Sequence, residues 1–123
     1  MTNALNWFEI PVTDMDRAKA FYGEVLDSEL KAFGIDELGD RTEMMLPYQD
    51  GVGGALVQHD DYTPSQEGSV VYLNGGDDLN VPLGKVEAAG GKPLTDKISI
   101  GENGFIAFFL DTEGNKVGFH SLG

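Results

Sequence analysis

Glu9 and His120 are the residues of this chain best suited to acid–base or metal chemistry. Each lies in a segment where apolar and polar residues alternate, a pattern that indicates a β-strand. A carboxylate and an imidazole that lie close together can bind a divalent cation or transfer a proton. The sequence therefore predicts Glu9 and His120 as candidate catalytic residues if the fold brings their strands together.

Both residues also have a structural interpretation. Glu9 could pair with a neighbouring lysine or arginine, and His120 could be a hydrogen-bonded structural histidine or a ligand-contacting group. The only other histidine is His59, which lies at the edge of a polar stretch and is expected on the surface. With only two histidines in the chain, there is little material for another metal site.

The alternation of side chains along a strand adds further residues to the face that carries Glu9 and His120, and so predicts a cavity. Alternate side chains of a strand face the same side of a sheet. The predicted ligand-binding cavity is lined by Trp7, Glu9, Tyr72, Asn74, Gly118 and His120. Aromatic area with a few polar groups suits a flat or amphipathic small molecule. The alternative is that these aromatic residues fill a small core.

Composition and charge restrict the class of protein. A chain of 123 residues with 41% hydrophobic residues is expected to form one domain, and the absence of cysteine excludes disulfides and thiolate metal ligands. The net charge of −13 argues against nucleic acid and anionic lipid as partners and would attract a cationic ligand. No apolar run is long enough to span a membrane, and a cytoplasmic location is expected.

The elements that position the candidate residues follow from periodicity and turn signals. In the first half we expect strands at 5–12, 29–33, 41–46 and 53–58, and a helix at 15–26 capped by Thr13 or Asp14. A polar linker follows at 61–68. In the second half we expect strands at 69–74, 92–99, 105–110 and 116–121, and a helix from Asp78 to Ala89 ended by Gly90-Gly91.

The two halves overlay with a shift of about sixty residues. Asp14-Met15 falls on Asp78-Leu79, and Gln49-Asp50-Gly51 falls on Thr112-Glu113-Gly114. The predicted fold class is therefore α+β, with one domain built from two βαβββ modules at 1–60 and 69–123.

Several segments carry a resemblance to a known superfamily. They are Pro11-Val12-Thr13-Asp14-Met15-Asp16-Arg17-Ala18-Lys19-Ala20-Phe21-Tyr22, Gly53-Gly54-Ala55-Leu56, Val86-Glu87-Ala88-Ala89-Gly90-Gly91 and Asp111-Thr112-Glu113-Gly114-Asn115-Lys116-Val117-Gly118. The chain resembles the vicinal oxygen chelate superfamily, which includes glyoxalase I, extradiol dioxygenases and bleomycin-resistance proteins. The resemblance implies a curved sheet and a homodimer, since the cavities of this superfamily often form across a twofold axis.

The resemblance also implies where metal ligands would stand. Metal-dependent members use His or Glu on four strands, and these positions fall on Trp7, Val70, Gly118 and a residue at or beside Leu56, with Ala55 and Val57 as its neighbours. None of these side chains suits a divalent cation, so no metal ligands and no cofactor are predicted, although a divalent metal bound by an unorthodox set such as Glu9 and His120 stays possible.

Three functions remain open at this point. The first is a metal-free protein that binds a small molecule, with cationic and aromatic compounds as the candidate ligands. The second is a metal-dependent lyase or isomerase similar to glyoxalase I, and the third is a non-catalytic interaction or regulatory module.

Overall fold

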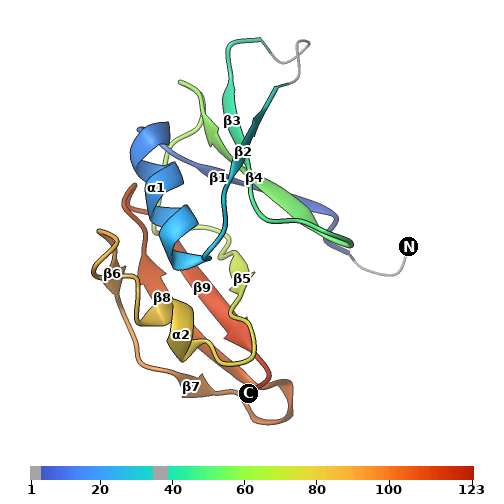
Figure 1. Cartoon of the computed structure of the whole chain (residues 1–123), viewed down its shortest axis with the longest axis vertical. Coiled ribbons are helices and arrows are strands. Elements are labelled where there is room, and N and C mark those ends of the chain that lie inside the picture. Colours follow the sequence, from blue (N-terminus) through green and yellow to red (C-terminus); the bar gives the residue numbers. More distant parts are fainter. Residues whose placement is uncertain (1–3, 35–38) are drawn as a thin grey trace.

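A four-stranded β-sheet, a five-stranded β-sheet and one principal helix make up the described part of the protein (Figure 1). The computed structural model describes residues 4–34 and 39–123. The first module contains β1 (Trp7–Pro11), α1 (Met15–Val25), β2 (Lys31–Phe33), β3 (Thr42–Met45) and β4 (Gly53–Gln58). The second contains β5 (Tyr72–Asn74), α2 (Asn80–Leu83), β6 (Lys92–Pro93), β7 (Ile98–Ser99), a 3₁₀ turn (Gly101–Asn103), β8 (Phe105–Leu110) and β9 (Lys116–Ser121).

The two sheets repeat one topology. Sheet A has the order β1-β4-β3-β2, and sheet B has the order β5-β9-β8-β6 with β7 also paired to β8. In each sheet the first strand runs parallel to the last, and the remaining neighbours are antiparallel. The predicted α+β fold of two βαβββ modules is confirmed. In the second module β6 and β7 together stand where β2 stands in the first.

Helix α1 begins where its sequence predicts. Asp14 has an extended backbone, and its side chain accepts a hydrogen bond from Arg17 N at 3.1 Å, which satisfies one of the free N–H groups of the first turn. The buried face of the helix consists of Met15, Ala18, Phe21, Tyr22 and Val25, which recur at helical spacing.

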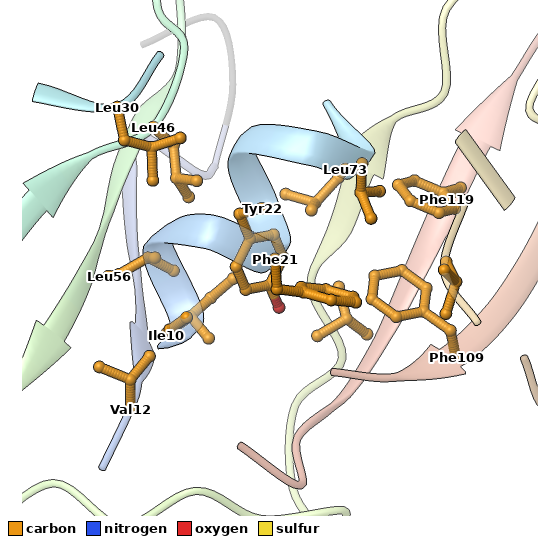
Figure 2. Close-up of a cluster of buried hydrophobic side chains, with 14 of the residues drawn as sticks. Ile10, Val12, Phe21, Tyr22, Leu30, Leu46, Leu56, Leu73, Phe109 and Phe119 are labelled. Carbon is orange, nitrogen blue, oxygen red and sulfur yellow. The ribbon is translucent and has the colours of Figure 1, made fainter. Parts of the chain in front are cut away.

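Helix α1 lies between the two sheets and forms the centre of the core. Figure 2 shows Tyr22 and Phe21 pointing between Ile10 and Leu56 of sheet A and Phe109 of sheet B. The Phe21 and Phe109 rings are 6.0 Å apart, and Phe109 stacks on Phe119 at 4.6 Å. One continuous core therefore joins the two modules, with the buried faces of both sheets turned toward α1.

A buried polar contact strengthens this junction. The Tyr22 hydroxyl donates to Asp111 Oδ2 at 2.7 Å, and burial together with the nearby carboxylate raises the pKa of Tyr22. Asp111 also accepts hydrogen bonds from Glu113 N and from the backbone and side chain of Asn115. Asn115 Nδ2 donates in addition to the Pro11 carbonyl at 2.7 Å. The turn between β8 and β9 is thus bound to α1 and to β1.

The second helix is shorter than expected. The sequence predicts a helix from Asp78 to Ala89, and α2 covers only Asn80–Leu83. Pro82 lacks an N–H group and Gly84 is a weak helix former. Beyond them the chain continues as turns with bonds such as Val86 N to Leu83 O.

The strand expected at 92–99 is also interrupted. It forms β6 and β7, and between them Leu94 N and Thr95 N both donate to the Phe108 carbonyl. Two residues facing one partner make a bulge, and Pro93 cannot donate to the ladder. Within the described residues, the helices are too short and too polar for any of them to cross a membrane.

Candidate ligand cavity

Each sheet has an outward face, the one turned away from α1. On sheet A the outward side chains of β1 and β4 include Trp7, Glu9 and Ala55, because Phe8 and Ile10 on the other parity pack in the core. On sheet B the outward face holds Tyr72, Asn74, Gly118 and His120, because Leu73, Val117 and Phe119 are buried against α1. The predicted cavity residues thus lie on two outward faces.

An aromatic ring lies across a glycine at the same place in both sheets. Trp7 pairs in register with Gly53, and Tyr72 pairs with Gly118. A Cβ added at Gly118 would lie 2.6 Å from Tyr72 Cδ2, and one added at Gly53 would lie 3.1 Å from the Trp7 ring. A Cβ at Gly118 would therefore collide with the Tyr72 ring, and a Cβ at Gly53 would crowd both Trp7 and Tyr48, whose Cδ2 would lie 2.9 Å away. Trp7 is 41% exposed and Tyr72 46%, so each ring offers a free aromatic surface.

The register of the parallel strands relates the two modules at this place. Tyr72 stands opposite Gly118 in sheet B, as Trp7 stands opposite Gly53 in sheet A. The assignment of the superfamily's fifth-strand ligand position to Val70, two residues before Tyr72, stays a prediction, as does that of the fourth-strand position to a residue at or beside Leu56.

Sheet A carries a charged cluster next to Trp7. Arg41 Nη2 donates to Glu9 Oε2 at 2.5 Å and to Glu43 Oε1 at 2.7 Å. The Arg41 side chain is 9% exposed and lies under the Tyr62 ring, 5.1 Å from its centroid. The hydrogen bond to Glu9 is the main cause that raises the pKa of Arg41. Pairing of Glu9 with a basic residue, one of the two interpretations from sequence, is confirmed.

Sequence reasoning missed Arg41 and Glu43. The alternation of side chains along the strands could have indicated them. Glu43 pairs with Val57, which lies on the same face of β4 as Ala55, the partner of Glu9, and Arg41 lies two residues before Glu43. Arg41 Nε and Glu43 Oε2 are buried and have no hydrogen-bond partner among the described residues.

Sheet B carries the open cavity. It has a volume of about 580 Å³ and is lined by Tyr72, Leu73, Asn74, Gly76, Asp77, His120, Ser121, Leu122 and Gly123. Three predicted site residues, Tyr72, Asn74 and His120, therefore line one cavity. His120 Nε2 lies 2.7 Å from the Asn103 carbonyl, so His120 is hydrogen-bonded as one of its sequence-based interpretations expects.

The structure does not bring Glu9 and His120 into contact within one chain. Glu9 belongs to sheet A and bonds to Arg41, whereas His120 belongs to sheet B and contacts Asn103. A joint catalytic role for the two stays a prediction.

The residues that the resemblance implies at the superfamily's metal-ligand positions do not fit a divalent cation. Trp7, Val70 and Gly118 supply an indole N–H, an isopropyl group and a hydrogen atom, and the residues at and beside Leu56 supply only alkyl groups, whereas divalent cations need several carboxylate, imidazole or thiolate ligands. Among residues 4–34 and 39–123, no group of three or more His, Cys, Asp or Glu side chains is placed to hold a metal ion.

His59 lies near the charged cluster of sheet A, since its ring packs edge-on against Tyr62, 5.9 Å between centroids, and Tyr62 covers Arg41. His59 Nδ1 accepts a hydrogen bond from Asp61 N at 3.1 Å, and its Nε2 lies 3.8 Å from Asp40 Oδ1. It borders a separate cavity of about 370 Å³ with Thr13, Thr42 and Gln58 among the lining residues. Its side chain is 23% exposed, so His59 is half-buried in the connection between modules rather than fully on the surface.

Comparison with known proteins defines the class. Residues 5–27 match the family model for the bleomycin resistance protein-like N-terminal domain. A glyoxylase-like domain-containing protein from Didymella fabae is 32% identical over 114 residues, covering 90% of this chain and 88% of the relative. The chain belongs to the glyoxalase and bleomycin-resistance group of the vicinal oxygen chelate superfamily.

Solved structures agree on the fold. Glyoxalase I from Zea mays superposes with a TM-score of 0.70 at 25% identity, over 94% of this chain and 44% of the maize chain. This chain thus spans less than half of the maize enzyme's length. A glyoxalase/bleomycin resistance protein from Albidiferax ferrireducens has a TM-score of 0.70 at 14% identity, over 97% of this chain and 98% of its own.

Proposed function

We propose that this protein binds a flat small molecule without a metal ion, in a cavity that two copies of the chain complete. The observation that carries the proposal is the repeated pair of an exposed aromatic ring on a glycine, Trp7 on Gly53 and Tyr72 on Gly118. These pairs lie on the four strands where the resemblance implies the ligands of metal-dependent members. Aromatic surface at that place favours stacking on a planar ligand over coordination of a cation.

The position of α1 supports the proposal that a second copy of the chain completes the cavity. Because α1 lies between the sheets, the outward face of sheet A and that of sheet B do not close on one another within one chain (Figure 1). At the start of β4, Trp7 and Tyr48 lie around Gly53 and the preceding residue is Val52, and each of these three apolar side chains is at least 39% accessible. Exposed apolar side chains gathered at one place favour association. A twofold dimer would set sheet A of one chain against sheet B of its partner.

The charge of the chain bears on the ligand. Arg41 neutralises one of the two carboxylates around it, so the cluster beside Trp7 keeps one negative charge. Together with the net charge of −13, this favours neutral or cationic aromatic molecules over polyanions. We propose a cytoplasmic location for this activity, which cell fractionation tests.

The fluorescence of Trp7, the only tryptophan, tests the proposal. We expect planar aromatic compounds to quench it saturably, with and without a chelator. Tyr72→Ala should abolish this quenching although Tyr72 lies on the other sheet, because both rings contact one ligand in the dimer. Val81→Ala, at a 63% exposed position on α2, is the control and should bind as the wild type does.

Two outcomes would contradict the proposal. A chain that sediments as a monomer and binds no planar compound is not a dimeric binding protein. Saturable binding that requires Mn²⁺, Ni²⁺ or Zn²⁺ would instead support a lyase or isomerase similar to glyoxalase I.

A further inference from the structure

The hydrogen bond of His120 fixes the tautomer of its ring. Nε2 lies 2.7 Å from the carbonyl oxygen of Asn103, and a carbonyl oxygen can only accept. Nε2 therefore carries the proton, and in the neutral ring Nδ1 keeps its lone pair. Among the described residues Nδ1 has no hydrogen-bond partner, and His120 lines the open cavity of sheet B.

A hydrogen bond to the backbone also fixes the orientation of the Asn74 amide, and Asn74 pairs in register with His120. Its Oδ1 accepts a hydrogen bond from Gly76 N at 2.8 Å, and a backbone N–H can only donate. The amide nitrogen Nδ2 is therefore the free end of this side chain. Asn74 and His120 occupy neighbouring positions on the parallel strands β5 and β9, so the cavity holds one free donor beside one free acceptor.

The ring of Tyr72 lies next to this pair. Tyr72 precedes Asn74 by one outward-facing position, rests on Gly118 and is 46% exposed. Its neighbour Phe108 has its ring centroid 5.8 Å away. An aromatic surface beside a donor and an acceptor matches a planar ring whose edge presents the complementary acceptor and donor.

We propose that the cavity of sheet B recognises a planar cyclic amide, a ring in which an N–H group stands beside a C=O group. The ligand N–H donates to His120 Nδ1, the ligand C=O accepts from Asn74 Nδ2, and the ring stacks on Tyr72. This inference rests on the proposed binding function and names the ligand class that the site selects. The Asn103 carbonyl acts through His120 as a positioning group, because it holds the ring in the accepting tautomer.

Two matched probes and two matched variants test the assignment. 2-Quinolone has the required edge, and N-methyl-2-quinolone keeps the ring and the C=O group but lacks the N–H donor. We expect the wild type to bind 2-quinolone about tenfold more tightly than its N-methyl derivative, because the derivative leaves Nδ1 unpaired. Calorimetry measures both affinities.

His120→Phe keeps a planar ring at this position and removes the Nδ1 acceptor, so the preference for 2-quinolone should disappear. Asn74→Asp retains the acceptor for Gly76 N and replaces the free donor, so both probes should bind about tenfold more weakly. Equal binding of the two probes by the wild type, or an unchanged preference in His120→Phe, would overturn the inference.

The tautomer is checked separately by long-range ¹H–¹⁵N correlation spectra. His59, whose Nδ1 also accepts, is the internal reference. A His120 ring protonated on Nδ1 overturns the inference. If planar compounds quench Trp7 but neither quinolone binds, the inference fails and the binding function stands; if no planar compound binds, the binding function itself fails.

Discussion

The Glu113 carboxylate accepts a hydrogen bond from Arg17 Nε at 2.7 Å, across 96 residues of sequence. The same carboxylate accepts from Thr13 N and Asp14 N, each at 2.8 Å, at the start of α1. A carboxylate at a helix N-terminus is stabilised by the free N–H groups and by the helix dipole. The β8–β9 turn of the second module therefore holds the helix that separates the two outward faces.

Glu113→Gln should lower the free energy of unfolding at neutral pH by about 2–3 kcal/mol, because it weakens several charge-assisted hydrogen bonds to a buried carboxylate. Urea unfolding measures this loss. Glu102→Gln, at an exposed position in the turn before β8, is the control and should change stability little.

The same carboxylate makes stability depend on pH. Burial opposes ionisation, but the hydrogen bonds from Arg17, Asp14 N, Thr13 N and Thr112 outweigh it and lower the pKa of Glu113 from 4.5 to about 2. The folded pKa is below the unfolded one, so this contribution is complete above about pH 4.5 and is lost as the pH falls toward about 2. The difference between wild type and Glu113→Gln should shrink over that range. A constant difference would show that the carboxylate is not the cause.

Tyr22→Phe should destabilise the protein by about 1–2 kcal/mol, since it removes a buried hydrogen bond to a charged group while leaving the packing of the ring intact. Tyr48→Phe, at a 55% exposed position, should have almost no effect in the same thermal unfolding experiment. Equal effects of the two substitutions would contradict the role assigned to the Tyr22–Asp111 contact.

Gly118→Ala should weaken ligand binding at least tenfold with a stability loss below about 1 kcal/mol, because the new Cβ displaces an exposed ring rather than a core one. Gly34→Ala, where a Cβ has no atom within 4 Å, is the matched control. If Gly118→Ala binds planar compounds normally, the contact of the Tyr72 ring with Gly118 has no part in recognition.

Arg41→Met should lower the free energy of unfolding by about 3–5 kcal/mol, because Glu43 would be left as a buried carboxylate without its counter-charge. The double variant Arg41→Met with Glu43→Leu should recover much of that loss, since it removes both buried charges. Chemical denaturation of the single and double variants measures the coupling. No recovery in the double variant would mean that packing of the Arg41 stem matters more than charge.

Local pattern was enough to predict β4, β8 and β9, whose bounds are those expected. They lie on largely apolar segments bounded by clear turns, and α1 has both a cap and an apolar stripe. The expected helix from Asp78 failed because the predicted apolar spacing took no account of Pro82 and Gly84.

The site was predicted less completely than the fold. Parity placed Tyr72, Asn74 and His120 on one face, because period-two facing is local information. The contact of Glu113 with α1 and the pairing of Arg41 with Glu9 depend on tertiary structure across 96 and 32 residues, which no local pattern contains.

Elemental analysis of freshly purified protein, paired with a thermal-shift titration of Mn²⁺, Ni²⁺ and Zn²⁺, tests the central claim of metal-free binding most directly. The structure-based expectation is substoichiometric metal, no saturable gain in Tm, and ligand binding unchanged by a chelator. Stoichiometric metal with a saturable gain in Tm that Glu9→Ala or His120→Ala abolishes would contradict the claim and establish a metal site built from those residues.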